Sequence, residues 1–234
     1  MGAMGKKGKM MYLIISDTHF GHENILRFER KGRFKTIAEH DEVILEVWKK
    51  CLRRLKSSDT FYFLGDFCVK GLESLYVERL LLPMHEAPCK KVMIMGNHDK
   101  DIDKELLYGL FDEVYDYPIY ISNRVVLSHF PCAVYDSQVN VHGHTHGMEL
   151  YDTNHICASV HVNRYAPVSS QVVESTVGKV SNWSTRFLYE PWASDYKLIQ
   201  SHDDVIADAD HRIDLSASRF SHKIKEELER YKNN

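Results

Sequence analysis

Short runs of hydrophobic residues recur along the chain, and each run ends where polar residues begin. Runs that are apolar throughout are typical of strands buried on both faces. Strands are therefore predicted at residues 11–16, 60–64, 91–95, 114–121, 124–127 and 139–142. The run at 92–95 stops at Gly96 and is followed by three polar residues, Asn97, His98 and Asp99.

Hydrophobic residues spaced three or four apart predict helices between these strands. The predicted helices cover residues 36–55, 72–82 and 103–110. The first is the clearest, because Thr36 and Glu39 form a capping box at its start. Its apolar face carries Ile44, Val47, Trp48, Cys51 and Leu55. Pro83 is expected to end the second helix, since proline cannot donate a backbone hydrogen bond inside a helix.

The alternation of strands and helices in the first half predicts parallel strands joined by helical crossovers. After Asp112 the connections shorten, and residues 131–138 are too few for a full helical crossover. The second half is therefore expected to form a more mixed sheet. The predicted fold class is α/β (α+β), with two sheets instead of one uniform doubly wound sheet.

A chain of 234 residues is long enough for one domain with an appendage. We place the domain at residues 11–174, after a leader or tag at 1–10 that lacks the apolar stretch of a secretory signal. Residues 175–234 form a C-terminal extension, in which 184–189 and 196–200 are a candidate strand pair. Its amphipathic helix carries Phe220, Ile224, Leu228 and Tyr231, which would pack on the core or on a partner in a homodimer.

Composition narrows the class of protein. No hydrophobic run approaches the roughly 18 to 20 residues that a membrane span needs, so a membrane partner is not expected. The five cysteines show no C-x-x-C spacing, which argues against a disulfide framework or zinc ribbon and favours a reducing cytoplasm. A net charge of −3 gives no overall basic field for nucleic acid.

One segment is nevertheless basic, and it contains Arg27, Arg30, Lys31, Arg33 and Lys35. We interpret it as a solvated face or, alternatively, as a rim that steers an anionic substrate toward the site.

Potential metal ligands follow five of the hydrophobic runs. They are Asp17, His19, Asp66, Asn97, His129, His144 and His146. In α/β proteins the loops after neighbouring strands converge at one edge of the sheet, where sites form. Oxygen and nitrogen ligands without a thiolate suit two divalent ions such as Mn, Fe, Zn or Ni. Two ions that share seven protein ligands keep open coordination positions, which is typical of a catalytic centre. Their residual positive charge favours the binding of a phosphate.

The segments DTH, GD, GNHD, SH and GHTH occur in this order, and together they resemble the motifs of the calcineurin-like metallophosphoesterases. The extended first motif, SDTHFGHENI, is similar to the compact microbial and phage branch of that superfamily, and the resemblance covers about residues 11–173. It implies a two-sheet mixed β-sandwich flanked by helices in a four-layer αββα arrangement. It also implies a dinuclear metal centre that hydrolyses phosphate esters.

The resemblance assigns roles to the motif residues. One ion would be held by Asp17, His19 and His146, the other by Asn97, His129 and His144, with Asp66 bridging both. A hydroxide between the ions would attack phosphorus, and His98 would protonate the leaving group. Asp99 would orient the His98 ring, although it is equally suited to cap the next helix.

Other histidines carry weaker signals. His22 and Asn24 are candidate substrate-binding residues, and His22 is equally suited to bond a loop. His142 is expected to be a core histidine, and His161 and Asn163 to have structural roles. The remaining histidines are expected at the surface or in packing; they are His40, His85, His155, His202, His211 and His222.

The expected function is a cytoplasmic metallophosphoesterase acting on a small phosphoester, and the absence of an evident cap domain favours phosphodiesters. The alternative enzyme is a nuclease or a nucleotide phosphomonoesterase with the same centre. Nucleotides are therefore candidate substrates, and nucleic acid is a less favoured one. The alternative of another class is a non-catalytic scaffold, which typically lacks the GNHD histidine or several ligands. This chain lacks none of them.

Overall fold

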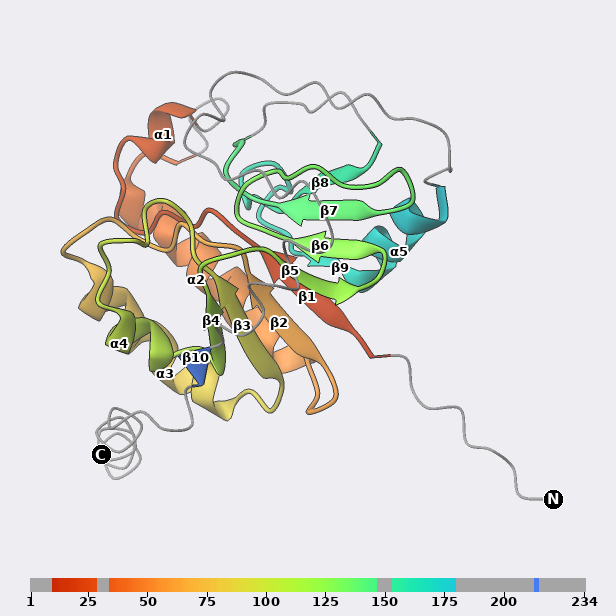
Figure 1. Ribbon diagram of the computed structural model, residues 1–234. Coiled ribbons are helices and arrows are strands. Elements are labelled where there is room, and N and C mark those ends of the chain that lie inside the picture. The colour runs from red at the N-terminus through yellow and green to blue at the C-terminus, as the bar shows by residue number, and fades with distance from the viewer. Residues whose placement is uncertain (1–9, 29–33, 147–152, 180–212, 215–234) are drawn as a thin grey trace.

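The structure is a computed structural model that describes residues 10–28, 34–146, 153–179 and 213–214 (Figure 1). The predicted strand pair and amphipathic helix of the C-terminal extension lie outside the described residues. Among the described residues, no helix is both long and apolar enough to span a membrane.

Two mixed sheets face each other (Figure 1). The first has the strand order β10 (Ile213–Asp214), β4 (Glu113–Tyr115), β3 (Lys90–Ile94), β2 (Thr60–Phe63), β1 (Tyr12–Ile15) and β9 (Val168–Ser169). The second has the order β5 (Ile119–Ser122), β6 (Val125–Leu127), β7 (Val139–His142) and β8 (His155–Cys157). The two-sheet α/β fold predicted from the sequence is confirmed.

The strands from β1 to β4 are parallel neighbours, as the crossover pattern predicts. In the second sheet β5 is antiparallel to β6, whereas β6, β7 and β8 are parallel, so that sheet is mixed. The single strand predicted at 114–121 is wrong. The segment forms β4 in one sheet and β5 in the other, and Pro118, which has no N–H to donate to a ladder, lies in the break between them.

The helices are α1 (Ile25–Phe28), α2 (Ile37–Arg54), α3 (Glu73–Glu86), α4 (Lys104–Tyr108) and α5 (Ser170–Lys179). Helix α2 begins as predicted, with the Thr36 side chain accepting a hydrogen bond from the Glu39 N–H. The predicted end of α3 at Pro83 is wrong, because the apolar face continues to the buried Met84. The missing N–H of Pro83 affects only the carbonyl of Arg79, an exposed residue that water can reach. Helix α5 was not predicted, and it runs across residue 174, where we place the end of the domain.

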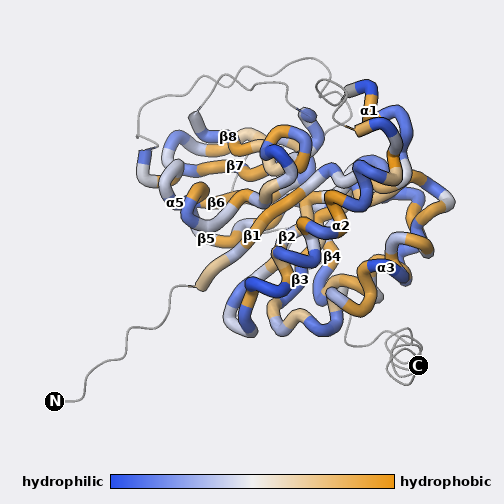
Figure 2. The backbone as a smooth tube through the Cα atoms, turned by 180° about the vertical axis from the view of Figure 1, so that it is seen from behind, coloured by the Kyte–Doolittle hydropathy of each residue, from blue (hydrophilic) through white to orange (hydrophobic). Residues whose placement is uncertain are grey.

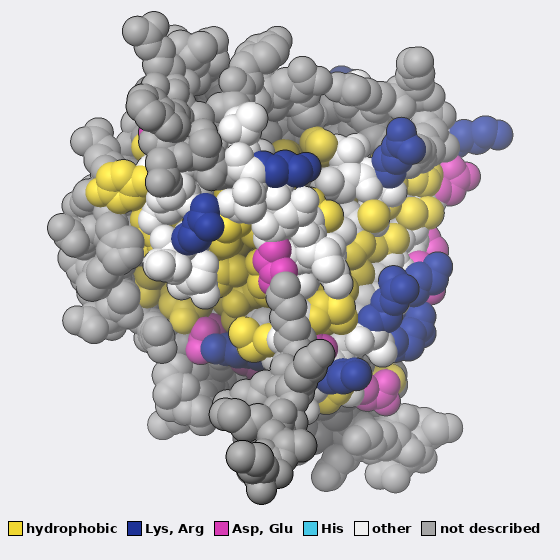
Figure 3. All heavy atoms as spheres, turned by 90° about the vertical axis from the view of Figure 1, so that its right-hand side faces the viewer, with side chains coloured by type: hydrophobic (Ala, Val, Ile, Leu, Met, Phe, Trp, Pro, Cys, Tyr) yellow, Lys and Arg dark blue, Asp and Glu magenta, His cyan; other side chains and the backbone are white. Residues whose placement is uncertain are grey.

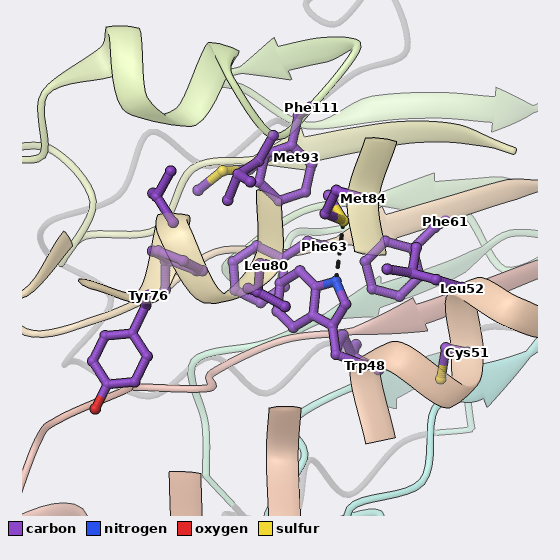
Figure 4. Close-up of a cluster of buried hydrophobic side chains, with 14 of the residues drawn as sticks. Trp48, Cys51, Leu52, Phe61, Phe63, Tyr76, Leu80, Met84, Met93 and Phe111 are labelled. Carbon is purple, nitrogen blue, oxygen red and sulfur yellow. Dashed lines mark hydrogen bonds between the residues drawn. The ribbon is translucent and has the colours of Figure 1, made fainter. Parts of the chain in front are cut away.

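Alternating residues of each central strand enter two separate cores. On β1, Leu13 and Ile15 pack toward helices α2, α3 and α4, whereas Ile14 packs between the two sheets. Figure 2 shows the resulting hydrophobic colour along β1. Trp48 of α2 lies at the centre of the helix-side core, and its indole N–H faces the Met84 sulfur at 3.2 Å (Figure 4). Because both faces of the strands are buried, their carboxyl ends are rigid supports for the loops that follow.

Candidate metal centre

The loops after β1, β2, β3, β6 and β7 bring all seven predicted ligands together. Ligand atoms within 4.8 Å of one another form two groups, which share one residue. The first contains Asp17, His19, Asp66 and His146, and the second contains Asp66, His129 and His144. The amide oxygen of Asn97 joins the second group, at 3.1 Å from both His129 Nε2 and His144 Nδ1.

Asp66 lies at the centre of the site. Its Oδ2 is 3.4 Å from Nε2 of His19, in the first group, and 3.4 Å from Nε2 of His129, in the second. Its Oδ1 accepts a hydrogen bond from the backbone N–H of His98 at 3.0 Å. The side chain is almost fully buried. A buried carboxylate between two sets of nitrogen donors is placed where one cation in each group would contact it.

Hydrogen bonds from neighbouring groups fix how the candidate ligands face the centre. Nδ1 of His129 lies 2.7 Å from the Leu64 carbonyl, so this nitrogen donates, and Nε2 is the nitrogen that would offer its lone pair to a cation once it has lost its proton. Asp17 accepts bonds from the Ser16 hydroxyl at 2.5 Å and from the His144 N–H at 2.9 Å. Metal ligands in proteins commonly have such supporting partners. The donor set, its tautomer and its burial fit divalent ions of the Mn, Fe, Zn or Ni type.

The backbone turns sharply at most of these ligands. Left-handed φ angles occur at Asp17 (58°), His19 (43°), Asp66 (58°), His144 (64°) and His146 (44°). This conformation is uncommon outside glycine and costs about 1–3 kcal/mol at such sites, although Asp and His tolerate it better than most residues. The buried strands offset this cost, and the turns aim consecutive loop residues into one small volume.

The glycines of two motifs are required by close packing. A Cβ on Gly96 would lie 2.2 Å from Asp66 Oδ1 and 2.8 Å from His129 Cε1. A Cβ on Gly65, which has a φ of +84°, would lie 2.3 Å from the Gly96 nitrogen. The loops after β2 and β3 therefore touch backbone to backbone, and this contact places Asp66 between the two groups of donors.

Asp99 joins these two loops. Its carboxylate accepts three backbone hydrogen bonds, from the N–H groups of Asp66, Phe67 and Gly96, at 2.7, 2.8 and 2.7 Å. It has no hydrogen bond to the His98 ring among the described residues, so the structure does not place Asp99 in the predicted orienting contact. It does not cap the next helix either, because Asp103 caps α4. The physical reason is that three converging N–H groups would be buried without partners if the carboxylate turned to His98.

His98 and His22 lie beside the donor groups without belonging to them. The exposed His98 ring meets the His19 ring edge to face at a centroid distance of 5.0 Å. The His22 ring lies 5.7 Å from that of His19 and 6.1 Å from that of His98. Asn24 is exposed, and its carbonyl accepts the Arg27 N–H at the start of α1. The face in Figure 3 shows hydrophobic side chains with Lys, Arg, Asp and Glu around them, and no histidine is visible among its coloured atoms.

The prediction placed His40 at the surface or in packing, and it missed a row of polar side chains in which His40 contacts Asp41 and His161. His40 is fully buried, bonds Asp41 and faces His161, which lies next to His146. The helical spacing was the one signal in the sequence for this burial. Asp41 precedes Ile44 by three residues and Trp48 by seven, so it lies on the same buried face of α2. His142 is buried, as predicted.

Burial and charge set the protonation of the metal-free site. Burial, together with the neighbouring His129, lowers the pKa of His144 to about 4. Burial also opposes the charged form of His129, but the carboxylate of Asp66 outweighs it and raises the pKa of His129 to about 9. The same pairing lowers the pKa of Asp66 against the effect of its burial. At neutral pH His129 therefore carries a proton that a cation must displace.

Metal affinity should accordingly rise with pH. Below about pH 9 the metal-free site holds one extra proton on His129, so the Mn²⁺ association constant should increase about tenfold per pH unit and level off above that value. Calorimetric titration in buffers of different ionisation heat should show about one proton released per chain. An affinity that is flat or falls as the pH rises toward 9 would contradict this assignment.

A family model described as calcineurin-like phosphoesterase matches residues 10–222. The chain belongs to the calcineurin-like phosphoesterase family. It is thus a member of a hydrolase family that acts on phosphoesters, and the resemblance found in the motifs is confirmed.

Individual relatives of this phosphoesterase have been found in sequence and in structure. An uncharacterized protein of Methanocaldococcus jannaschii is 28% identical over 176 residues, which are 71% of this chain and 90% of that protein. The crystal structure of a protein of unknown function from Aquifex aeolicus is 30% identical, with a TM-score of 0.55, over 71% of this chain and 98% of that one. The crystal structure of a Pseudomonas putida nuclease is 22% identical, with a TM-score of 0.39, over 58% and 61% of the two chains.

Proposed function

We propose that this chain is a two-metal phosphoesterase that hydrolyses phosphodiesters in preference to phosphomonoesters. The observation that carries the proposal is the buried carboxylate of Asp66, whose Oδ2 is equally distant from a histidine of each donor group. A single structural ion would not need two such groups. A pair of ions sharing one carboxylate is the arrangement used for in-line displacement at phosphorus.

The residues of the two groups would each hold one ion. Asp17, His19 and His146 would hold the first, Asn97, His129 and His144 the second, and Asp66 would contact both. When bound, such ions lower the pKa of water and offset the charge that develops on a phosphoryl group. The identity of the ions is proposed as Mn, Fe, Zn or Ni from the nitrogen and oxygen donors.

His98 is proposed as the general acid. Its ring is exposed beside His19, and its backbone N–H is fixed to Asp66 Oδ1, so the side chain stands next to the donor groups without being needed as a ligand. An imidazole there can hold a proton near the oxygen of a departing alkoxide. This position, not contact with Asp99, supports the assignment.

His22 is proposed to bind a phosphate oxygen. Its Nδ1 atom is buried and has no hydrogen-bond partner among the described residues. Burial, followed by the neighbouring His98 and His146, lowers the pKa of His22, so the ring is neutral at pH 7 and can present one N–H donor. Asn24, two residues further on and exposed, is proposed as a second polar contact at the rim.

The preference for diesters rests on the compact core. Among the described residues no additional domain is inserted between the strands of the two sheets, which supports a site edge that is not covered by a cap domain. We propose a small diester or a nucleotide as substrate, and we do not favour nucleic acid. All five cysteines are free, which supports a reducing cytoplasm as the proposed compartment.

A hydrolysis panel tests the proposal. The full chain, loaded with Mn²⁺ or Ni²⁺, should hydrolyse bis(p-nitrophenyl) phosphate faster than p-nitrophenyl phosphate, and chelation should abolish the activity until metal is restored. Nucleotides and a single-stranded oligonucleotide complete the panel. Faster cleavage of the monoester would overturn the diester preference, and preferred cleavage of the oligonucleotide would favour a nuclease. No hydrolysis by the metal-loaded protein would indicate a scaffold.

A further inference from the structure

His146 is held differently from His129, although both belong to the donor groups. Nδ1 of His129 is bonded to the Leu64 carbonyl, whereas Nδ1 of His146 is buried and has no hydrogen-bond partner among the described residues. The backbone of His146 is also in the left-handed region, at a φ of 44°. Metal-ligating histidines usually donate their second N–H to a partner that fixes the ring. The ring of His146 must be held in another way.

Among the described residues, two rings contact the ring of His146. The His146 ring lies between that of His19, at a centroid distance of 4.8 Å, and that of His161, at 5.4 Å. Its Nε2 faces the site, at 3.0 Å from His19 Nε2 and 3.7 Å from Asp17 Oδ1. His19 is itself a proposed ligand, so His161 is the contact that comes from outside the donor groups.

His161 is fixed in turn at both of its nitrogens. Its Nε2 lies 3.0 Å from Nε2 of His40, and its Nδ1 lies 3.4 Å from the hydroxyl of the buried Ser159. The rings of His40 and His161 are nearly parallel, with an interplanar angle of 8° and a centroid distance of 5.3 Å. The ring has therefore little freedom to turn.

The row of hydrogen-bonded side chains that begins at His161 continues through His40 and ends at the buried carboxylate of Asp41. Asp41 accepts hydrogen bonds from the Gly21 N–H at 2.8 Å and from the Tyr76 hydroxyl, and its Oδ1 lies 2.9 Å from Nδ1 of His40. If His40 donates its Nδ1 proton to this carboxylate, its Nε2 accepts from His161 Nε2–H. The Nδ1 of His161 then accepts from the Ser159 hydroxyl. With these assignments, each of the two histidines has one tautomer that satisfies all of its contacts in this row.

We propose that His161, fixed by Asp41 and His40, is a positioning residue for His146, in place of the hydrogen bond to Nδ1 that the described residues do not supply. Burying His40 and Asp41 in an otherwise apolar core, with the half-buried His161 beside them, is costly unless these groups are hydrogen-bonded, so this hydrogen-bonded row is a specific feature of the fold. The inference rests on the proposed two-metal centre. It assigns the effect to one ion only, the ion held by Asp17, His19, Asp66 and His146.

Titration of the metal-free full chain with Mn²⁺, followed by calorimetry and by the EPR signal of bound Mn²⁺, tests this inference. The wild type should bind two ions. His161→Ala should weaken one of them about 10- to 100-fold, as loss of a supporting partner does at other metal sites, and leave the other unchanged. His40→Ala should weaken the same ion. His155→Ala should change neither, because this partly buried histidine of β8 bonds the Cys132 carbonyl instead.

If His161 had a purely structural role, His161→Ala would lower the affinities for both Mn²⁺ ions together, or would lower only the melting temperature. Either result would overturn the inference. So would a His161→Ala variant that binds both ions with the affinities of the wild type. His161→Gln, which removes the ring but keeps an N–H, gives the same test if the alanine variant does not fold. If the wild type binds two ions and only the selective loss is missing, the inference alone fails. If the wild type binds no Mn²⁺, the proposed function fails with it.

Discussion

Asp66→Asn is expected to abolish hydrolysis and to weaken the binding of both metal ions. The side chain keeps its shape but loses the charge that faces both donor groups, with Oδ2 3.4 Å from His19 and from His129. Metal ions supply several kcal/mol of transition-state stabilisation, so the loss of both should lower kcat/KM by about 10³-fold or more. Diester hydrolysis and Mn²⁺ stoichiometry measure the two effects.

The matched control for this variant is Asp101→Asn. Asp101 is an exposed aspartate whose carboxylate pairs with Lys70 at 3.3 Å on the surface, and such pairs contribute little to stability. It should keep both ions and full activity. If Asp66→Asn still bound two ions with affinities near those of the wild type, the shared position of Asp66 would be wrong.

His98→Asn is expected to lower the rate strongly for poor leaving groups and weakly for good ones. An alkoxide needs a proton as its bond to phosphorus breaks, whereas p-nitrophenolate leaves without one. General acid catalysis contributes about 10²- to 10⁴-fold, so the alkyl diester should lose that much and the nitrophenyl diester far less. Because His98 lies outside both donor groups, the variant should bind metal as the wild type does.

Rates of His98→Asn on a series of diesters with graded leaving groups measure this dependence. The nitrophenyl substrate serves as an internal control for folding and metal loading. Equal losses for good and poor leaving groups would argue against proton donation and for a role of His98 in binding the phosphate.

The central strands and the positions of the candidate ligands were predictable because each depends on local pattern. Runs such as residues 92–95 are apolar throughout, and a strand buried on both faces follows from that alone. The ligands follow those runs directly, so predicting the strands also predicts which loops converge. The glycines before Asp66 and Asn97 were visible as turn residues, but their steric role required the structure.

The errors arise where tertiary contacts outweigh local pattern. Residues 114–121 look like one strand, yet the chain crosses between the sheets there. Pro83 is tolerated in α3 because the buried Met84 beyond it gains contacts with the core. Asp99 looks like a partner for its neighbour in sequence, but the N–H groups of Asp66 and Phe67 come from another loop. His40 and His161 are far apart in sequence, so no periodicity connects them.

Anomalous diffraction at the manganese edge, from crystals of the chain grown with Mn²⁺, tests the central claim most directly. The predicted result is two peaks about 3.5–4 Å apart. One should lie among Asp17, His19 and His146, the other among Asn97, His129 and His144, and both should contact Asp66. A single peak, or peaks that avoid Asp66, would contradict a two-metal centre at this site.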